Sequence, residues 1–289
     1  MPELELSAGT IDYEDTGGDG PTLLFQHGLA MSGTVWRNVV ADLRADHRCV
    51  VPNLPLGAHR RPMHPDADLS MAGIANLIAE LLERLELDDV TLVVNDWGGG
   101  QLLAADRNPR LAALVLTPCE AFDNVPPGLP GRGVAIASAL PGGIYAMVQP
   151  MRLRWPRRLP MALGWMSKRP IPDEIVDDWF EPLLTNGDIR RDLRKYARTW
   201  REGRRTLVEA AERLAHFDRP ALVAWATEDR VMPRDHGRRL ADLMPRGRLI
   251  EIDDSYALMP EDQPSRLASE IRGFVREATN TPDAHRVRA

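Results

Sequence analysis

Residues 91–100 constrain the fold of this chain more than any other segment. They read Thr-Leu-Val-Val-Asn-Asp-Trp-Gly-Gly-Gly, so an apolar, β-branched stretch breaks abruptly into glycines. Such a stretch predicts a strand buried on both faces, and the small residues permit a sharp turn from that strand into a helix. Asp96 stands at the turning point. We expect its carboxyl group at the carboxyl edge of a parallel sheet, either displayed for chemistry or capping a helix that starts near Gly98.

A second strand-like run, residues 22–28, ends in His27-Gly28 and is followed by Leu29. Together the two runs resemble the α/β-hydrolase fold, in which a tight elbow between strand and helix carries the nucleophile. This resemblance covers residues from about 9 to 276. It implies an α/β architecture with a doubly wound, mostly parallel eight-stranded sheet and an inserted helical cap. It also implies an oxyanion hole formed by the backbone N–H groups of Leu29 and Trp97.

The remaining signals follow the same order. Strand-like runs at 49–53, 113–117, 221–226 and 248–252 alternate with helical patterns, and residues 1–20 predict a leading antiparallel hairpin. We therefore divide the chain into a core at 1–120 and 217–277, a helical cap at 121–216 and a flexible tail at 278–289. Apolar residues at helical spacing predict an amphipathic helix before the elbow strand; they are Ile74, Leu77, Ile78, Leu81, Leu82 and Leu85. Large side chains of the cap, of which we expect a minority to face a pocket, are Tyr145, Trp155, Trp165, Met166, Trp179, Tyr196 and Trp200.

Within this fold, Asp followed by Trp at the elbow resembles haloalkane dehalogenases and epoxide hydrolases. In those enzymes the aspartate attacks carbon and forms an alkyl-enzyme ester, and a histidine then activates the water that cleaves it. Trp97 matches the residue whose indole N–H binds the leaving halide, whereas Leu29 stands where dehalogenases often have a second halide-binding residue, Asn. The segment 225–233 matches the loop of the triad acid, which makes Asp229 the equivalent residue.

The histidine that this resemblance implies is absent. Residues 252–264 read Ile-Asp-Asp-Ser-Tyr-Ala-Leu-Met-Pro-Glu-Asp-Gln-Pro, and alignment of the first and last of them with the family pattern places Ala257 at the histidine. A methyl group accepts no proton. Loss of the histidine from a Ser-His-Asp hydrolase costs about six decades in turnover, or roughly 8 kcal/mol. An ester on Asp96 would therefore be stranded unless another group activated water.

Four residues are candidates for a substitute or for the pocket. His27 belongs to the strand–loop motif, where the family uses it to shape the loop. His59 follows a strand end, which places it at the pocket mouth on our interpretation. Tyr256 either donates a hydrogen bond or orients water in place of the missing base, or packs as an aromatic ring beneath the cap. Glu120 follows the strand before the cap, at a spacing that fits a second acid or a residue that orients the cap entrance.

Three functions stay open. The first is a hydrolase-like enzyme in which Asp96 is nucleophile or acid–base residue and Asp229 is the acid. The second is a cofactor-free cyclase, isomerase or lyase of secondary metabolism, in which an apolar pocket raises the pKa of Asp96 towards a useful range. The third is a catalytically inactive protein that keeps the cavity to bind a small molecule.

Composition bounds these functions. The 289 residues, 44% of them hydrophobic, suffice for one large core with an inserted cap, and the net charge of −6 argues against nucleic acid as a partner. Cys49 and Cys119 fall in or beside predicted buried strands, as is typical of reduced cysteines in a cytosolic protein. The sequence shows no signal peptide and no apolar run of membrane-spanning length. We expect a cytoplasmic protein with a small hydrophobic substrate and no metal, cofactor or membrane partner; the sequence does not predict its oligomeric state.

Overall fold

The computed structural model describes residues 1–280. One eight-stranded sheet runs through the molecule in the order β1-β2-β4-β3-β5-β6-β7-β8, with β1 and β2 antiparallel to their neighbours and the remaining pairs parallel. The strands are β1 (Glu3–Leu6), β2 (Gly9–Asp15), β3 (Thr22–Gln26), β4 (Arg48–Pro52), β5 (Val90–Asp96), β6 (Leu111–Cys119), β7 (Ala221–Ala226) and β8 (Gly247–Ile252). This arrangement confirms the predicted α/β class, the mostly parallel sheet and the leading hairpin.

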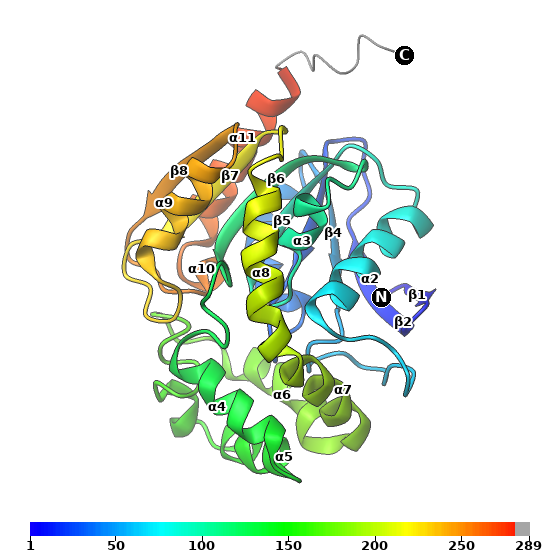
Figure 1. Cartoon of the computed structure of the whole chain (residues 1–289), viewed down its shortest axis with the longest axis vertical. Coiled ribbons are helices and arrows are strands. Elements are labelled where there is room, and N and C mark those ends of the chain that lie inside the picture. The colour runs from blue at the N-terminus through cyan, green and yellow to red at the C-terminus, as the bar shows by residue number, and fades with distance from the viewer. Residues whose placement is uncertain (281–289) are drawn as a thin grey trace.

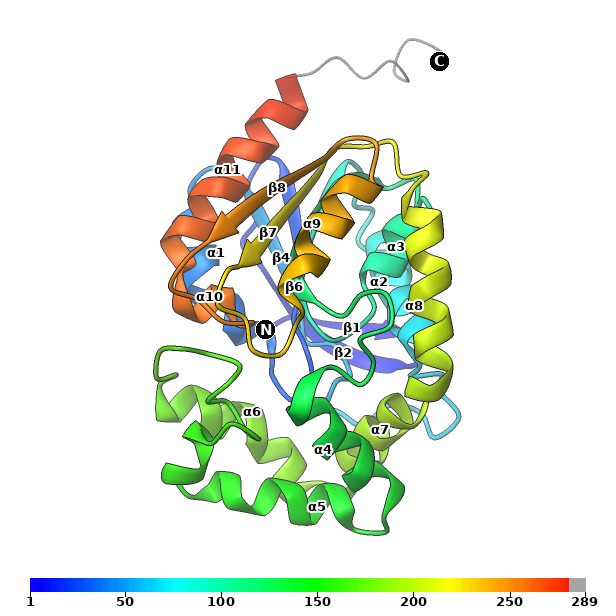
Figure 2. The same cartoon turned by 60° about the vertical axis from the view of Figure 1, so that its left-hand side comes forward.

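Helices cover both faces of the sheet (Figures 1 and 2). Those on one face are α2 (Met71–Arg84), α3 (Gln101–Ala105), α8 (Trp200–Leu214) and α9 (Arg234–Leu243), and those on the other are α1 (Arg37–Leu43) and α11 (Pro264–Asn280). The short helices η1 (Gly33–Trp36) and α10 (Met259–Asp262) lie in loops beyond strand ends. Because α11 continues to Asn280, it includes the first residues of the predicted tail; the rest of that tail, 281–289, lies outside the described residues.

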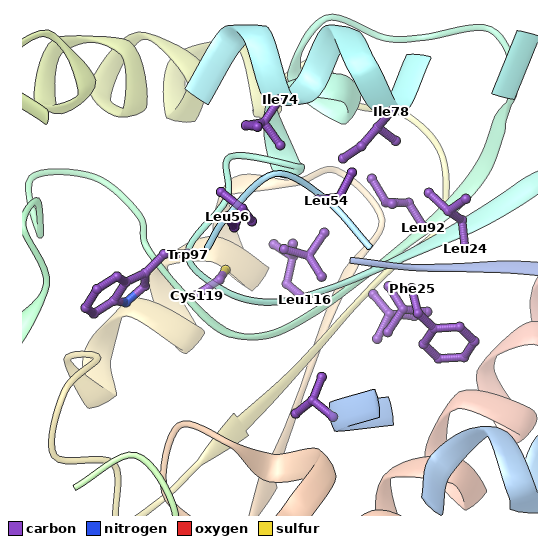
Figure 3. Close-up of a cluster of buried hydrophobic side chains, with 14 of the residues drawn as sticks. Leu24, Phe25, Leu54, Leu56, Ile74, Ile78, Leu92, Trp97, Leu116 and Cys119 are labelled. Carbon is purple, nitrogen blue, oxygen red and sulfur yellow. The ribbon is translucent and has the colours of Figure 1, made fainter. Parts of the chain in front are cut away.

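The helix before the elbow strand shows how sequence pattern becomes packing. Ser70 caps α2 by accepting a hydrogen bond from the N–H of Gly73 at 3.1 Å, which satisfies one of the free donors of the first turn. Ile74 and Ile78 then point at the sheet beside Leu92, as Figure 3 shows. Each aliphatic side chain buried in this way stabilises the fold by roughly 1.5–3 kcal/mol relative to its exposed state. The predicted amphipathic helix is confirmed.

The segment between β6 and α8 forms a separate group of helices beyond the carboxyl ends of the strands (Figures 1 and 2). We call this group the cap; its members are α4 (Gly128–Ala139), α5 (Gly143–Val148), η2 (Gln149–Arg152), η3 (Trp155–Arg158), α6 (Asp173–Thr185) and α7 (Gly187–Arg198). Although the predicted cap range of 121–216 includes α8, that helix lies along the sheet beside α3. Within residues 1–280, the helices are all too short or too polar to traverse a lipid bilayer.

Candidate active site

The elbow predicted at Asp96 is a tight reversal between β5 and α3. Asp96 has a φ of +61°, a left-handed conformation that non-glycine residues seldom adopt and that costs on the order of 1–3 kcal/mol. Crowding explains the neighbouring small residues. A Cβ atom on Gly28 would overlap the carboxyl group of Asp96, and one on Gly100 would overlap the side-chain amide of Gln26. The turn is therefore compact enough to hold one acidic side chain at the strand end.

The carboxyl group of Asp96 is buried, with the side chain oriented by backbone donors. Its Oδ2 atom accepts a hydrogen bond from the N–H of Leu29 at 3.2 Å, and the N–H of Trp97 also stabilises the charged form. These are the two N–H groups predicted to form an oxyanion hole. The other oxygen, Oδ1, is buried and has no hydrogen-bond partner within residues 1–280. Asp96 does not cap α3, whose N-cap residue is Gly100.

Burial is the main reason that the pKa of Asp96 lies well above its usual value of 3.8. The negative field of Glu120 raises that pKa further, and the field of Asp229 adds a smaller contribution in the same direction. The N–H groups of Trp97 and Leu29 oppose the rise because they stabilise the carboxylate. The Asp96 carboxyl therefore becomes a nucleophile or base as the pH rises through this elevated pKa.

Glu120 supports the turn that follows Asp96. Its Oε1 atom accepts hydrogen bonds from the N–H groups of Gly98 at 2.9 Å and Gly99 at 2.7 Å. If Asp96 capped the following helix, its own carboxyl group would accept hydrogen bonds from these N–H groups. Burial raises the pKa of Glu120 from 4.5 to about 7, although these N–H groups lower it. The predicted roles of Glu120 as a second acid or as a guide for the cap entrance stay predictions.

Asp229 lies in the turn after β7, and its side chain is held in the same manner. Its Oδ1 atom accepts hydrogen bonds from the N–H groups of Val231 at 2.7 Å and Met232 at 2.8 Å. Burial raises the pKa of Asp229 from 3.8 to about 7. The residue that matches the triad acid is therefore rigidly placed but poorly solvated.

Asp96, Glu120 and Asp229 are all buried carboxyl groups with raised pKa values, and we call them the carboxyl cluster. In each, one oxygen is held by backbone N–H groups, while the other is buried without a partner; these free atoms are Asp96 Oδ1, Glu120 Oε2 and Asp229 Oδ2. No ion pair joins any of the three to a Lys, Arg or His among residues 1–280. In a Ser-His-Asp site, the acid stabilises the imidazolium that forms beside it. Without such a partner, the neutral forms of the three carboxyls are favoured.

Ala257, at the position aligned with the family histidine, is buried in the loop after β8. Its carbonyl oxygen accepts a hydrogen bond from Asn95 Nδ2 at 2.9 Å, and the next residue, Leu258, donates its N–H to the carbonyl of Met166 in the cap segment at 2.7 Å. Asn95 thus joins the end of β5 to the loop after β8. The loop is tied both to the elbow strand and to the segment above it, and Ala257 offers only a methyl group.

The two candidate histidines already use both ring nitrogens. His27 Nδ1–H donates to the carbonyl of Gly28 and Nε2 accepts the N–H of Leu54, each at 2.8 Å, while burial lowers the pKa of His27 to about 4. His59 Nδ1 accepts the N–H of Gly57, and its Nε2–H donates to Asp192 of α7, each at 3.3 Å. His27 therefore holds the loop after β3. Rather than facing the cavity described below, His59 ties the loop after β4 to the cap.

Tyr256, the other candidate substitute, has two cations as neighbours. The guanidinium of Arg230 lies 4.7 Å and the ammonium of Lys168 lies 5.9 Å from its ring centroid. Cation–π contacts of this kind stabilise by about 0.5–2 kcal/mol and fix the ring. Tyr256 is not among the residues that line the cavity next to Asp96. The contacts favour the packing interpretation over water activation.

A cavity of about 250 Å³ lies between the elbow and the cap. Asp96 is the only titratable residue that lines it, within the part of the chain described here, and Trp97 and Leu29 adjoin it there. Of the seven large cap side chains considered from the sequence, only Met166 takes part in the lining. Five methionines contribute, namely Met31, Met147, Met151, Met161 and Met166. Because methionine side chains are flexible and polarisable, this wall suits apolar ligands of varied shape.

Tyr196 is a residue beside the site that sequence reasoning placed only among large cap side chains. It is fully buried on α7, and burial together with the negative fields of Glu120 and Asp96 raises the pKa of its hydroxyl. Its ring packs edge-on against Trp200, and Trp200 packs edge-on against Trp97. No local signal distinguishes Tyr196 from the other apolar positions of its helix, because the proximity arises from how the cap sits on the core.

Comparison with known proteins identifies the family of the chain. A model described as the alpha/beta hydrolase family matches residues 23–270. The chain belongs to the alpha/beta hydrolase family. Haloalkane dehalogenase 2 of Mycobacterium bovis is 25% identical over 279 residues, which cover 93% of this chain and 92% of that protein. A cis-3-alkyl-4-alkyloxetan-2-one decarboxylase of Xanthomonas campestris is 27% identical over 285 residues, which cover 92% of both proteins.

Solved structures agree on the architecture. The crystal structure of an ancestral haloalkane dehalogenase superposes with a TM-score of 0.76 and covers 97% of this chain and 100% of that one. The sequence identity between the two is 21%. At this level the likeness shows the shared fold. The alpha/beta hydrolase chain described here therefore resembles dehalogenases in its fold, while its chemistry has to be argued from its own residues.

Proposed function

We propose that this alpha/beta hydrolase is an enzyme that binds a small hydrophobic molecule in its cavity and acts on it through Asp96. The observation that carries the proposal is the position of Asp96 as the only titratable residue lining an apolar cavity, among residues 1–280, with Oδ1 free of partners. Oδ2 is held by the N–H of Leu29, which fixes the direction of the free oxygen. A carboxylate fixed in this way beside an apolar cavity is arranged for nucleophilic or acid–base catalysis.

As a nucleophile, ionised Asp96 attacks an alkyl carbon that bears a halide or an epoxide oxygen. The new carbon–oxygen bond makes an alkyl-enzyme ester, and a halide leaves with the bonding electrons. With an epoxide, the ring oxygen takes the bonding electrons, stays on the neighbouring carbon and is protonated by solvent, which gives a hydroxyalkyl ester. The indole Nε1 of Trp97 is buried and has no hydrogen-bond partner in the described chain, so its N–H is available to stabilise the leaving group. The N–H groups of Leu29 and Trp97 stabilise the ionised carboxylate before it attacks. They would stabilise a developing oxyanion only if water later attacked the carbonyl of the ester.

The second step of a hydrolytic cycle needs a base that activates water, and Ala257 supplies none. The candidates His59 and Tyr256 are engaged elsewhere, as described above. Loss of the histidine removes roughly 8 kcal/mol of transition-state stabilisation. The ester therefore persists, or it is resolved by chemistry that uses no water.

A second candidate function, a lyase acting on a β-lactone, meets this requirement. It is favoured by Ala257 together with the Xanthomonas relative, whose name describes decarboxylation of an oxetan-2-one. Asp96 attacks the saturated ring carbon bonded to the ring oxygen, and that carbon–oxygen bond breaks, so the ring opens to an alkyl-enzyme ester that carries a free carboxylate. Loss of carbon dioxide then leaves an electron pair that forms a carbon–carbon double bond and expels the Asp96 carboxylate. The cycle needs neither water nor an added base.

Intact-protein mass spectrometry after exposure to a bromoalkane or an alkyl epoxide tests the first step. We expect an adduct of one alkyl group per chain on Asp96, and none on the Asp96→Asn variant. Free alcohol or diol formed over many turnovers would point to a substitute base, which His59→Ala and Tyr256→Phe would then identify. Absence of adduct and product from the wild type would argue against Asp96 as a nucleophile towards these substrates. Binding of a ligand that Asp96→Asn retains would then favour the inactive binding protein.

A dialkyl β-lactone separates the lyase from the hydrolase. We expect an alkene and carbon dioxide in equal amounts, measured by gas chromatography, and neither from Asp96→Asn. A hydroxy acid in place of the alkene would show that water opens the ring and would contradict the lyase. Because the two substrates give different products, either result can be read without the other.

A further inference from the structure

One segment of the cap, positions 129 to 161, carries most of the large apolar side chains that are exposed to solvent. Of the ten such side chains exposed within residues 1–280, eight lie between positions 129 and 161, and only Met1 and Val208 lie elsewhere. We call these eight the apolar cap surface; they are Leu129, Ile136, Leu140, Tyr145, Leu153, Trp155, Leu159 and Met161. Trp155 is 69% exposed and Ile136 is 65% exposed. Single exposed apolar residues are common on soluble proteins, but grouped ones mark an interaction surface.

The same segment is strongly basic. Residues 124–172 contain seven Lys and Arg residues and no Asp or Glu, so the rest of a chain whose net charge is −6 carries −13. Arg132, Arg152, Arg154 and Arg158 are exposed on this segment. Four of the seven pair with acids outside the segment: Arg154 and Arg157 with Asp173, and Lys168 and Arg169 with Asp254. Arg132, Arg152 and Arg158 form no ion pair within residues 1–280, and these three leave positive charge on the segment, which attracts it to a negatively charged surface.

The apolar cap surface is continuous with the cavity that holds Asp96. Leu159 and Met161 are 43% and 51% exposed, and both also line the cavity. Pro156, the neighbour of exposed Trp155, lines the cavity as well. Figures 1 and 2 show α4 and α5 at the end of the molecule opposite the end of α11, so the core does not cover this side. An apolar molecule can therefore pass from the surface to Asp96 along apolar side chains.

We propose that the cap docks on an anionic lipid surface and takes its hydrophobic ligand from there. Tryptophan and leucine side chains enter the headgroup region, while arginines pair with lipid phosphates. Anionic lipid supplies both the apolar contact and the negative charge that this surface lacks. A second copy of the chain is disfavoured as the occupant, because facing caps would bring together the arginines at 132, 152 and 158 of both copies, which form no ion pair within residues 1–280. The sequence-based expectation of no membrane partner was based on the absence of a spanning segment, which surface docking does not need.

Vesicle flotation with the full chain tests this proposal without turnover. We expect the protein to bind vesicles of phosphatidylcholine with roughly one-third phosphatidylglycerol, and to bind pure phosphatidylcholine about tenfold more weakly or less. High salt should release it. Arg154→Gln and Arg158→Gln should each weaken binding about fivefold, and Trp155→Ser should weaken it on both lipids. The matched controls Arg238→Gln and Val208→Ser, exposed on α9 and α8, should bind as the wild type does.

Several outcomes would overturn the proposal. No vesicle binding, equal binding to both lipids, or full binding by Trp155→Ser would each do so. Concentration-dependent dimers that Trp155→Ser abolishes, in the absence of vesicle binding, would assign the surface to a second copy instead. Circular dichroism and thermal unfolding confirm that each variant is folded. Asp96→Asn should bind vesicles normally, so failure of the proposed catalytic function leaves this result readable.

Discussion

Replacing Asp229 with Asn should stabilise the protein at neutral and alkaline pH. The side chain is 6% exposed, and no ion pair joins it to a residue among 1–280. Burial raises its pKa from 3.8 to about 7. At 1.36 kcal/mol for each pKa unit, ionising Asp229 inside the folded protein costs about 4 kcal/mol more than ionising it in the unfolded chain. An asparagine keeps the acceptor atom for the N–H groups of Val231 and Met232 but carries no charge.

The pH dependence has a definite sign. The unfolded chain releases this proton near pH 3.8, whereas the folded protein keeps it until about pH 7. Between these values the folded state binds more protons, so the contribution of Asp229 to the free energy of unfolding falls as the pH rises. Below that window, Asp229→Asn and the wild type should be equally stable. Above it, the variant should be more stable by up to about 4 kcal/mol.

Urea unfolding of the two proteins near pH 4 and at pH 8 measures this difference. Asp242→Asn, an exposed position on α9, is the matched control and should change stability by less than about 0.5 kcal/mol at either pH. If Asp229→Asn is instead less stable than the wild type at pH 8, Asp229 is charged and stabilising, and the reasoning on the carboxyl cluster fails. If Asp229→Asn gains stability but loses activity, the result would fit a site that keeps poorly solvated acids for function at the expense of stability.

Three further predictions concern the base, the elbow and the core. Ala257→His should turn a persistent Asp96 adduct into free alcohol with repeated turnover, by up to about six decades in ester cleavage followed by gas chromatography; a folded but inert variant would mean that more than the base has changed. Glu120→Gln removes a negative neighbour and so lowers the pKa of Asp96, which should move the rise of adduct formation to lower pH. An unchanged pH profile would contradict that electrostatic link. Ile78→Ala should cost about 2–5 kcal/mol in urea unfolding, and a loss below about 1 kcal/mol would argue against the packing of α2 on the sheet.

Much of the scaffold was predictable because its signals are local. An apolar run followed by glycines predicts the strand, turn and helix around Asp96, and the structure shows the tight turn that this pattern requires. The position of Asp229 after a late strand was implied by the resemblance of its loop to the triad-acid loop of α/β-hydrolases, and the structure shows Asp229 after β7. The helix that contains Ile74 and Ile78 followed from a regular apolar spacing. In each case, neighbouring residues decide the conformation.

The parts that escaped prediction depend on contacts between distant segments. Nothing near His59 indicates that its ring meets Asp192, which follows it by 133 positions. The helix α8 falls within the continuous run of helical segments that predicted the cap, yet it packs along the sheet beside α3. The cavity wall of methionines was also unforeseen, because only tertiary packing decides which apolar cap residues face inward and which, like Trp155, face outward.

The central claim is that Asp96 can begin a substitution reaction, and that no imidazole among residues 1–280 is placed to finish it. Bromide released from an excess of a bromoalkane, counted against the protein by ion chromatography, tests this most directly. We predict a burst of about one equivalent per chain that then stops, and no release from Asp96→Asn. Continued release over many equivalents would contradict the claim that the site lacks a base. No release from the wild type would contradict the claim that Asp96 is a nucleophile.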